Sequence, residues 1–261
     1  MAQKVTTGIG VGSAGATKTL GQILSPGDVA IVQYASSGPD AFTFVALRDI
    51  QAGTTINFTD NGWLASGGFL PGEGTVTYTA STLIAAGTAV TLTGLDLDSA
   101  GDQIIAYQGD AANPTFLYAI DLADGDQAFA GDATGTTTSA IPWGLTPGFT
   151  AVAVSFDDAA YNGPGSGSQS ELLAAVSNPA NWPNTRLLRG VSISPFIFGP
   201  EIDLDANNST HLGLDFSTQY VPGGAAVRIS DTDVRITDSF GLFLFSATIT
   251  APGGISAPNF R

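Results

Sequence analysis

The chain has 261 residues, and its 23 Asp and Glu outnumber its 8 Lys and Arg, which gives a formal net charge of -15. It has no cysteine and one histidine, which excludes disulfide scaffolds, zinc-thiolate sites and cysteine nucleophiles. Its 43% content of hydrophobic residues excludes wholesale disorder. Because so acidic a protein repels phosphate groups, we expect no binding to nucleic acid or to anionic lipid.

The acidic residues are 20 Asp and only 3 Glu, and the chain has only 2 Lys. Glu and Lys favour helices whereas Asp favours turns and caps, so strands and loops should dominate. The longest uncharged runs, residues 74–95 and 239–260, are interrupted by Gly, Pro and Thr and alternate with a period of two. They are typical of paired strands, and we expect no membrane span.

The first 22 residues differ in charge from the rest of the chain. They contain both lysines, and no acidic residue occurs before Asp28. Twenty-two extended residues reach about 70 Å, whereas a compact body of some 240 residues is roughly 45 Å across. We therefore interpret residues 1–22 as an extended arm that can reach a neighbouring subunit. The residues expected to make that contact are Lys4, Val5, Thr7, Ile9, Val11 and Lys18.

Residues 23–261 are predicted to form a single all-β domain, an antiparallel β-sandwich of the jelly-roll or Ig-like kind. Short alternating apolar runs are separated by turn residues at spacings typical of a sandwich or barrel. In the run from residue 150 to 156, Val152, Val154 and Phe156 share one face, the pattern of a half-buried antiparallel strand. The expected strands are residues 28–34, 41–49, 54–59, 75–80, 88–93, 103–107, 115–121, 150–156, 191–198, 225–230 and 240–250.

One short helix is predicted after Ser168. Ser168 and Glu171 have the spacing of a capping box, an apolar run follows, and Asn178-Pro179 ends it. The last predicted strand has large apolar residues on both faces between Phe240 and Phe245. This pattern requires burial on both sides, either as a central strand or at a subunit interface.

No catalytic motif is present. The nearest approach to a nucleophile elbow, residues 163–167, has proline where the first glycine of the motif is needed. His211, the only histidine, lies in a polar loop typical of the surface. Phosphate-binding and dinucleotide-binding glycine motifs are also missing. We therefore expect that the protein is not an enzyme.

Calcium is the cofactor that the acidic loops favour, because hard cations take several oxygen ligands from loops. Neither of two candidate segments has EF-hand spacing, and the glycine-rich calcium nonapeptide is missing. The alternative for each residue is a solvated aspartate in a turn. The candidate ligands are Asp121, Asp124 and Asp126 in one segment and Glu201, Asp203 and Asp205 in the other.

Several segments resemble a known family. Residues 27–34, 39–45 and 52–63, followed by Ser170-Glu171-Leu172-Leu173 and by residues 178–182, look like a lamin-tail-like β-sandwich domain. The resemblance covers most of residues 27–190. Such domains occur in large secreted proteins of cyanobacteria and other bacteria, beside calcium-repeat, nuclease or phosphatase regions. The resemblance implies an extracellular or cell-surface location and carries no catalytic residues.

The sequence favours a structural protein that polymerises into a filament or surface layer. In this hypothesis the arm adds as a strand to the sheet of the next copy, and its lysines meet that copy's acidic surface. The alternative is a calcium-dependent adhesin or carbohydrate-binding module, in which Trp63, Trp143 and Trp182 could stack on sugar rings. A third hypothesis is an accessory domain of a secreted hydrolase.

Overall fold

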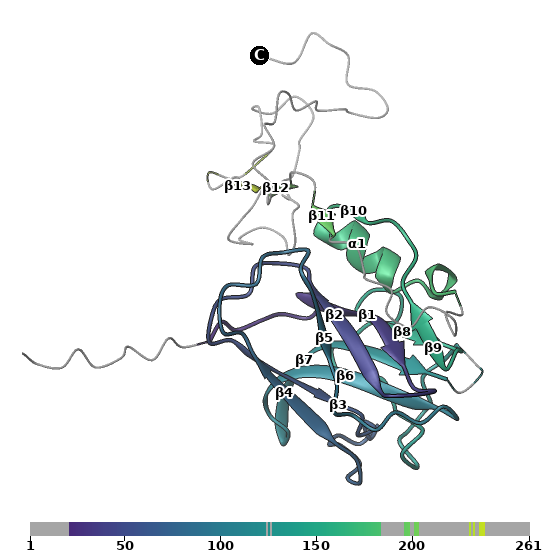
Figure 1. The fold of residues 1–261 in the computed structure, drawn as a ribbon. Helices are drawn as coiled ribbons and strands as arrows, with labels where there is room; N and C mark the ends of the chain where they lie inside the picture. Colours follow the sequence, from purple (N-terminus) through teal and green to yellow (C-terminus); the bar gives the residue numbers. More distant parts are fainter. Residues whose placement is uncertain are drawn as a thin grey trace, which may run out of the picture.

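The structure, a computed structural model, is an all-β sandwich with one α-helix among the residues described. These residues are 21–123, 125, 127–183, 196–198, 201–203, 230, 232 and 235–237. Two sheets form its layers (Figure 1). The fold class expected from the alternating apolar runs is therefore confirmed.

The smaller sheet has four antiparallel strands. In spatial order they are β5 (Ala89–Leu92), β2 (Ala41–Ala46), β1 (Val29–Ala35) and β9 (Asp158–Ala160). The larger sheet has five strands, and its last pair, β7 and β8, is parallel. In spatial order they are β4 (Thr75–Thr79), β3 (Thr55–Thr59), β6 (Asp102–Asp110), β7 (Asn113–Leu122) and β8 (Ala151–Val154).

The core lies between the two sheets because strand residues alternate between their faces. In β3, Ile56 and Phe58 are fully buried, whereas Thr55 is exposed. The Phe58 ring lies 5.0 Å from the rings of both Phe42 and Phe44 in β2. This aromatic cluster joins β2 of one layer to β3 of the other.

A second apolar cluster covers the outer face of the larger sheet. Trp63 and Phe69, from the loop after β3, pack on Phe116 of β7 and belong to the same cluster as Ala151 of β8. All four residues of β8 are consequently buried. The expectation of a half-buried antiparallel strand at residues 150–156 is wrong, because loops cover the second face and β8 pairs with β7 in parallel.

The predicted helix is confirmed as α1 (Gln169–Val176). Ser168 Oγ accepts the N–H of Glu171 at 3.3 Å, and the Glu171 carboxylate accepts the N–H of Ser168 at 2.9 Å, so both bonds of the capping box are present. Leu172, Leu173 and Val176 are buried against the sandwich. A 3₁₀ turn, η1 (Pro179–Asn181), follows at the predicted stop.

Residues 196–198 dock onto the same body. The Phe196 ring stacks on Tyr161 with centroids 5.6 Å apart, and its N–H donates to the carbonyl of Gly87 at 3.2 Å. Gly87 has φ +86, and a Cβ there would lie 2.1 Å from the carbonyl oxygen of Phe196. Only glycine fits this close approach.

Two small strand pairs complete the described elements. Strand β10 (Ser166–Gly167) pairs in parallel with β11 (Ile197–Phe198), and β12 (Glu201–Asp203) pairs with β13 (Arg235–Thr237). The short strands β9, β10, β12 and β13 were not predicted. The expected strand at residues 225–230, apart from Ser230, lies outside the described residues, as do the strand at 240–250 with its double-faced segment Phe240–Phe245 and His211.

We expect Phe58→Ala to lower the free energy of unfolding by about 3 to 5 kcal/mol, because it leaves a cavity between the two sheets. Leu83→Ala removes an apolar side chain that is 53% exposed, so its effect should stay within about 0.5 kcal/mol. Urea unfolding of both variants measures the difference. Equal effects would contradict the placement of Phe58 at the centre of the core.

Candidate functional site

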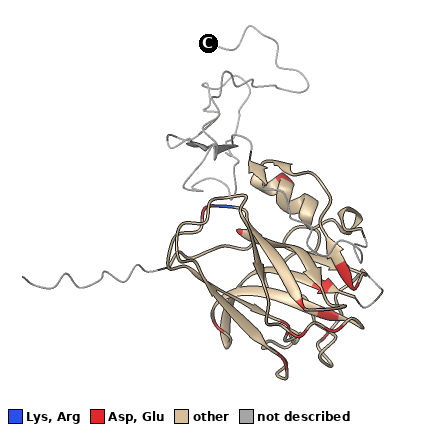
Figure 2. Ribbon diagram, viewed as in Figure 1, with Lys and Arg blue, Asp and Glu red and all other residues tan. Residues whose placement is uncertain are grey.

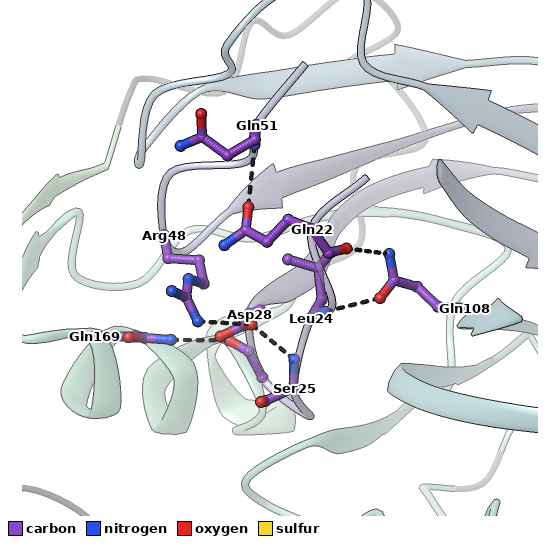
Figure 3. A network of polar contacts seen from close by, with 9 residues as sticks. Gln22, Leu24, Ser25, Asp28, Arg48, Gln51, Gln108 and Gln169 are labelled. Atoms are coloured by element: carbon purple, nitrogen blue, oxygen red, sulfur yellow. Dashed lines mark hydrogen bonds and ion pairs between the residues drawn. The ribbon is translucent and has the colours of Figure 1, made fainter. Parts of the chain in front are cut away.

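The structure places the root of the N-terminal arm beside the larger sheet. Gln22 donates its N–H to Thr54 Oγ1 at 2.9 Å, and its side-chain oxygen accepts the N–H of Gln51 at 3.0 Å. Gln108 of β6 donates to the carbonyl of Gln22 at 3.1 Å and accepts the N–H of Leu24 at 2.8 Å (Figure 3). The chain is therefore fixed to the body from residue 22 onward, next to the start of β3.

An ion pair between Arg48 and Asp28 lies in the same region. Arg48 Nη1 lies 3.3 Å from Asp28 Oδ2, which also accepts the N–H of Ser25 at 2.7 Å (Figure 3). Asp28 is buried and Arg48 is half exposed, so the pair fixes the turn before β1 rather than forming an open charged patch. This turn orients the segment that follows the arm.

One strand of the larger sheet has an open edge. Strand β4 lies at the end of the sheet order, and in the described part of the chain no strand lies on its far side. The N–H of Ala80 donates to the carbonyl of Thr54 at 2.9 Å. Because bonded pairs alternate along an antiparallel ladder, the bonds to β3 continue at Tyr78 and Val76, and Thr75, Thr77 and Thr79 direct their main-chain groups outward.

The faces of β4 differ in polarity. Thr75, Thr77 and Thr79 are exposed on one face, while Val76 and Tyr78 are half-buried and pack against the core. The strand contains no charged residue and no proline. Edge strands in natural proteins usually carry such features, or are covered, because their free N–H and C=O groups bind other strands. Strand β4 thus offers both main-chain groups and uncovered apolar surface.

Carboxylates from separate segments gather at the end of the larger sheet where β4 begins. Asp60, which follows β3, is fully buried and accepts the N–H groups of Gly74 at 2.6 Å and Asp96 at 3.0 Å. Asp102, at the start of β6, accepts the N–H groups of Asp98 at 2.8 Å and Gln103 at 2.7 Å. Through these main-chain donors the two carboxylates fix the loop between β3 and β4 and the loop between β5 and β6 to the end of the sheet.

Glu73 lies at the same end, immediately before Gly74. Its carboxylate is 3.4 Å from the side-chain nitrogen of Gln103, which also donates to Asp102 at 3.1 Å. Partial burial, reinforced by the charges of Asp60, Asp96 and Asp98, raises the pKa of Glu73 to about 7. We name Asp60, Glu73, Asp96, Asp98 and Asp102 the acidic end.

Asp102 is more deeply buried than Glu73, and its pKa is also raised. Burial is the main cause and the charges of Glu73 and Asp60 add to it, whereas hydrogen bonds from Asp98 and Gln103 oppose it. The resulting pKa is about 8. Asp102 and a part of the Glu73 population therefore hold a proton at neutral pH. A cation placed nearby would favour the ionised form of both groups.

The sandwich body has almost no positive charge with which to compensate these groups. Residues 21–183 contain sixteen Asp and Glu and one basic residue, Arg48. Figure 2 shows acidic positions recurring along the loops and strand ends, whereas basic colouring of the sandwich is confined to one loop. A positively charged segment is therefore the complement that this surface lacks.

The predicted calcium ligands are only partly within the described residues. Asp121 is buried at the end of β7, opposite Gln103 of β6. Asp124, Asp126 and Asp205 lie outside the described residues, and Glu201 and Asp203 are in β12, where only the main chain is described. Across the side chains that the structure describes, no three acidic or histidine residues are arranged to hold a metal ion. Calcium binding stays a prediction.

The three tryptophans have different environments. Trp63 and Trp182 are 3% and 2% exposed, so the hypothesis that they are stacking platforms for sugars is wrong: both belong to apolar clusters. Trp143 is 60% exposed and packs edge-on against Trp63, with ring centroids 5.5 Å apart. A Cβ at Gly67 would lie 2.6 Å from the Trp143 ring, so the absence of a side chain there makes room for the indole.

The six residues expected to act in the arm, Lys4, Val5, Thr7, Ile9, Val11 and Lys18, lie outside the described residues. Sequence reasoning missed the acidic end, since its five carboxylates come from four separate segments. It also missed the open edge of β4, although the absence of charge in residues 75–79 was a signal for it. The described helices include none long and apolar enough to cross a bilayer.

Comparisons with protein-family models, with curated proteins and with solved structures find no match to this chain. The physical description of its surfaces is therefore the basis for a functional proposal.

We expect the thermal stability of the protein to fall as the pH rises from about 5 to about 8.5. The pKa values of Glu73 and Asp102 rise on folding from 4.5 and 3.8 to about 7 and about 8. Between these limits the folded protein binds more protons than the unfolded chain, so unfolding becomes easier as the pH increases. We expect Tm to fall by about 2 to 4 °C or more over this pH range. A fall of that size corresponds to a loss of about 1 kcal/mol in the free energy of unfolding for a domain of this size.

Glu73→Gln should reduce this decrease, because it removes one of the titrating groups. Asp110→Asn, which removes the same charge at the far end of β6, serves as the matched control and should leave the pH dependence unchanged. Circular dichroism melts at several pH values make the measurement. The same slope in wild type, Glu73→Gln and Asp110→Asn would show that the acidic end does not titrate in this range.

Proposed function

We propose that the protein is a structural, self-assembling subunit of an extracellular filament or surface layer, which polymerises by donating its N-terminal arm to the next copy. The open edge of β4 is the observation that carries this proposal. An added strand gains main-chain hydrogen bonds along such an edge, and side-chain pockets set its register. A chain in which each copy both donates and accepts can continue without closing.

Charge supports assembly through the arm. Residues 1–20 contain two lysines and no acidic residue, whereas the body from residue 21 to residue 183 contains sixteen acidic residues and one arginine. Without the arm, two bodies repel each other. With it, Lys4 or Lys18 can approach the neighbour's carboxylates, including the acidic end, where burial and mutual repulsion oppose ionisation.

The position of the arm's root also supports the proposal. Gln22 and Leu24 are hydrogen-bonded to Thr54 and Gln108, so the body holds the end of the donated segment firmly. Twenty residues precede Gly21, and an extended segment of that length spans roughly 65 Å. This reach is sufficient to cross to a second sandwich while the body remains folded around its own core.

Deletion of residues 1–20 should convert the assembled protein into a folded monomer. The core contacts and the clamp at Gln22 remain in this variant, so its circular dichroism spectrum and Tm should match those of the wild type. Light scattering after size exclusion, with negative-stain microscopy, reports the assembly. Filaments or sheets that persist after the deletion would rule out the arm as the donor.

The exchange of both lysines for glutamine should weaken assembly without abolishing it, because the main-chain bonds remain. The same variant should lose most of the salt dependence of the wild type, since exposed charges are screened within about 10 Å at 0.1 M salt. The variant Lys4→Arg/Lys18→Arg, which keeps both positive charges, is the matched control and should assemble as the wild type does.

Carbohydrate binding is a second candidate function, favoured by Trp143. Its indole is exposed, but it packs against Trp63 and fits over Gly67, which has no side chain to obstruct it. An aromatic ring that is already fixed in this way loses little entropy when it stacks on a ligand. The main-chain N–H of Ala65, two residues before Gly67, donates to the carboxylate of Asp132 at 2.8 Å. This bond places a negative charge in the same loop region. An acidic neighbourhood of this kind favours a neutral sugar over an anionic one.

Trp143→Ala should abolish glycan binding and leave the Tm within a few degrees of the wild-type value, because the removed ring is mostly exposed. Phe149→Ala, at a residue 42% exposed, is the matched control. A neutral glycan array probed with arm-deleted protein measures binding without the avidity of polymers. Binding that is the same in the Trp143 variant and the wild type would exclude this surface.

A further inference from the structure

Among the four edges of the two sheets, three are short or covered. Strand β8 is buried along its whole length. Strand β9 has three residues, and the chain beyond it continues into hydrogen bonds of Tyr161 with Val32 and of Asn162 with Asn181. Strand β5 has four residues, of which only Thr91 is exposed. The fourth edge, β4, has five residues that alternate between exposed and half-buried.

We propose that the edge of β4 is the acceptor for residues 5–11 of a second copy of this chain. This inference rests on the proposed function and names the surface that the arm binds. The outward main-chain groups of Thr75, Thr77 and Thr79 supply the ladder. The partner is the N-terminal arm of a second copy, whose length, charge and alternation fit this edge.

The alternation of the arm matches the two faces of β4. In an extended segment Val5, Thr7, Ile9 and Val11 lie on one face, and Thr6, Gly8 and Gly10 lie on the other. Val76 and Tyr78 are half-buried at the open margin of the core. When the apolar face of the arm continues the face of Val76 and Tyr78, it covers them and leaves the small residues beside the threonines.

Charge selects the direction of the added strand. Lys4 immediately precedes the alternating segment of the arm, and Glu73 lies two residues before the first residue of β4. A parallel alignment brings these opposite charges to the same end of the ladder, beside the acidic end. An antiparallel alignment places Lys4 beyond Thr79, away from Glu73. We therefore infer that the arm and β4 run in parallel.

Crosslinking between single-cysteine variants tests the acceptor, since the chain has no native cysteine. Thr6→Cys is placed in the arm, on the face that lies beside the threonines of β4; Thr77→Cys is placed on the β4 edge, and Thr91→Cys on the β5 edge as the matched control. Both edge positions are exposed threonines. Full-length proteins, one of each pair tagged to separate the mixed product, are mixed and treated with a short bis-maleimide, whose reach tolerates a small shift in register.

We expect the mixture of Thr6→Cys with Thr77→Cys to give a mixed covalent dimer, and the mixture of Thr6→Cys with Thr91→Cys to give at least tenfold less. Crosslinking at Thr91 instead, or at neither edge while polymers form normally, would overturn β4 as the acceptor and leave assembly through the arm intact. Polymers that persist after deletion of residues 1–20 would instead refute the proposed function itself.

The double variant Thr6→Cys/Thr77→Cys separates exchange between copies from insertion of the arm into its own sheet. The root of the arm lies beside Thr54, which pairs with the end of the β4 ladder, so the chain's own edge is within its reach. Treated at high dilution, the variant should stay free of internal crosslinks. An internally crosslinked monomer would overturn the inference that a second copy is the occupant.

Discussion

The structure depends on satisfying main-chain hydrogen-bonding groups in a body that has almost no cations. Two sheets pair most of the strand N–H and C=O groups, and buried carboxylates accept several N–H groups of the loops. Asp60 bonds to the N–H groups of two loop residues, and Asp158 bonds to those of Ser36 and Ser37. A carboxylate without a salt bridge is tolerated in such a site because several amide dipoles point at it.

This arrangement has an electrostatic consequence. The carboxylates that accept hydrogen bonds from the loops lie at the same end of the larger sheet. There the side-chain nitrogen of Gln103 donates to both Glu73 and Asp102. Burial, reinforced by the neighbouring negative charges, then opposes ionisation and raises the pKa of both groups. The interactions that shape the loops thus also create a surface that favours positive charge, and residues 1–20 are the nearest basic segment in the sequence.

The two faces of the larger sheet are covered by different means, and this leaves one edge open. The smaller sheet covers the inner face, while Trp63, Phe69 and their neighbours cover the outer face over β6, β7 and β8. That cover does not extend to β4, where threonines remain exposed on one face and two apolar residues remain half-buried on the other. Assembly at β4 would complete both the hydrogen bonding of the sheet and the cover of its core.

The sequence by itself determined the class of fold, the first eight strands to within a few residues, and the helix with its N-terminal capping box and its stop at Asn178-Pro179. These features are local: a period of two requires only that one face of a strand be buried, and the capping box of Ser168 and Glu171 spans a single turn. Only the tertiary structure decided which strands are edges, that β8 is parallel and buried on both faces, and that Asp60, Glu73 and Asp102 lie together. Each of these depends on contacts between segments far apart in the chain, which alternation and composition do not encode. Burial likewise separated Trp143 from Trp63 and Trp182, since the exposure of an aromatic ring depends on which loop covers it.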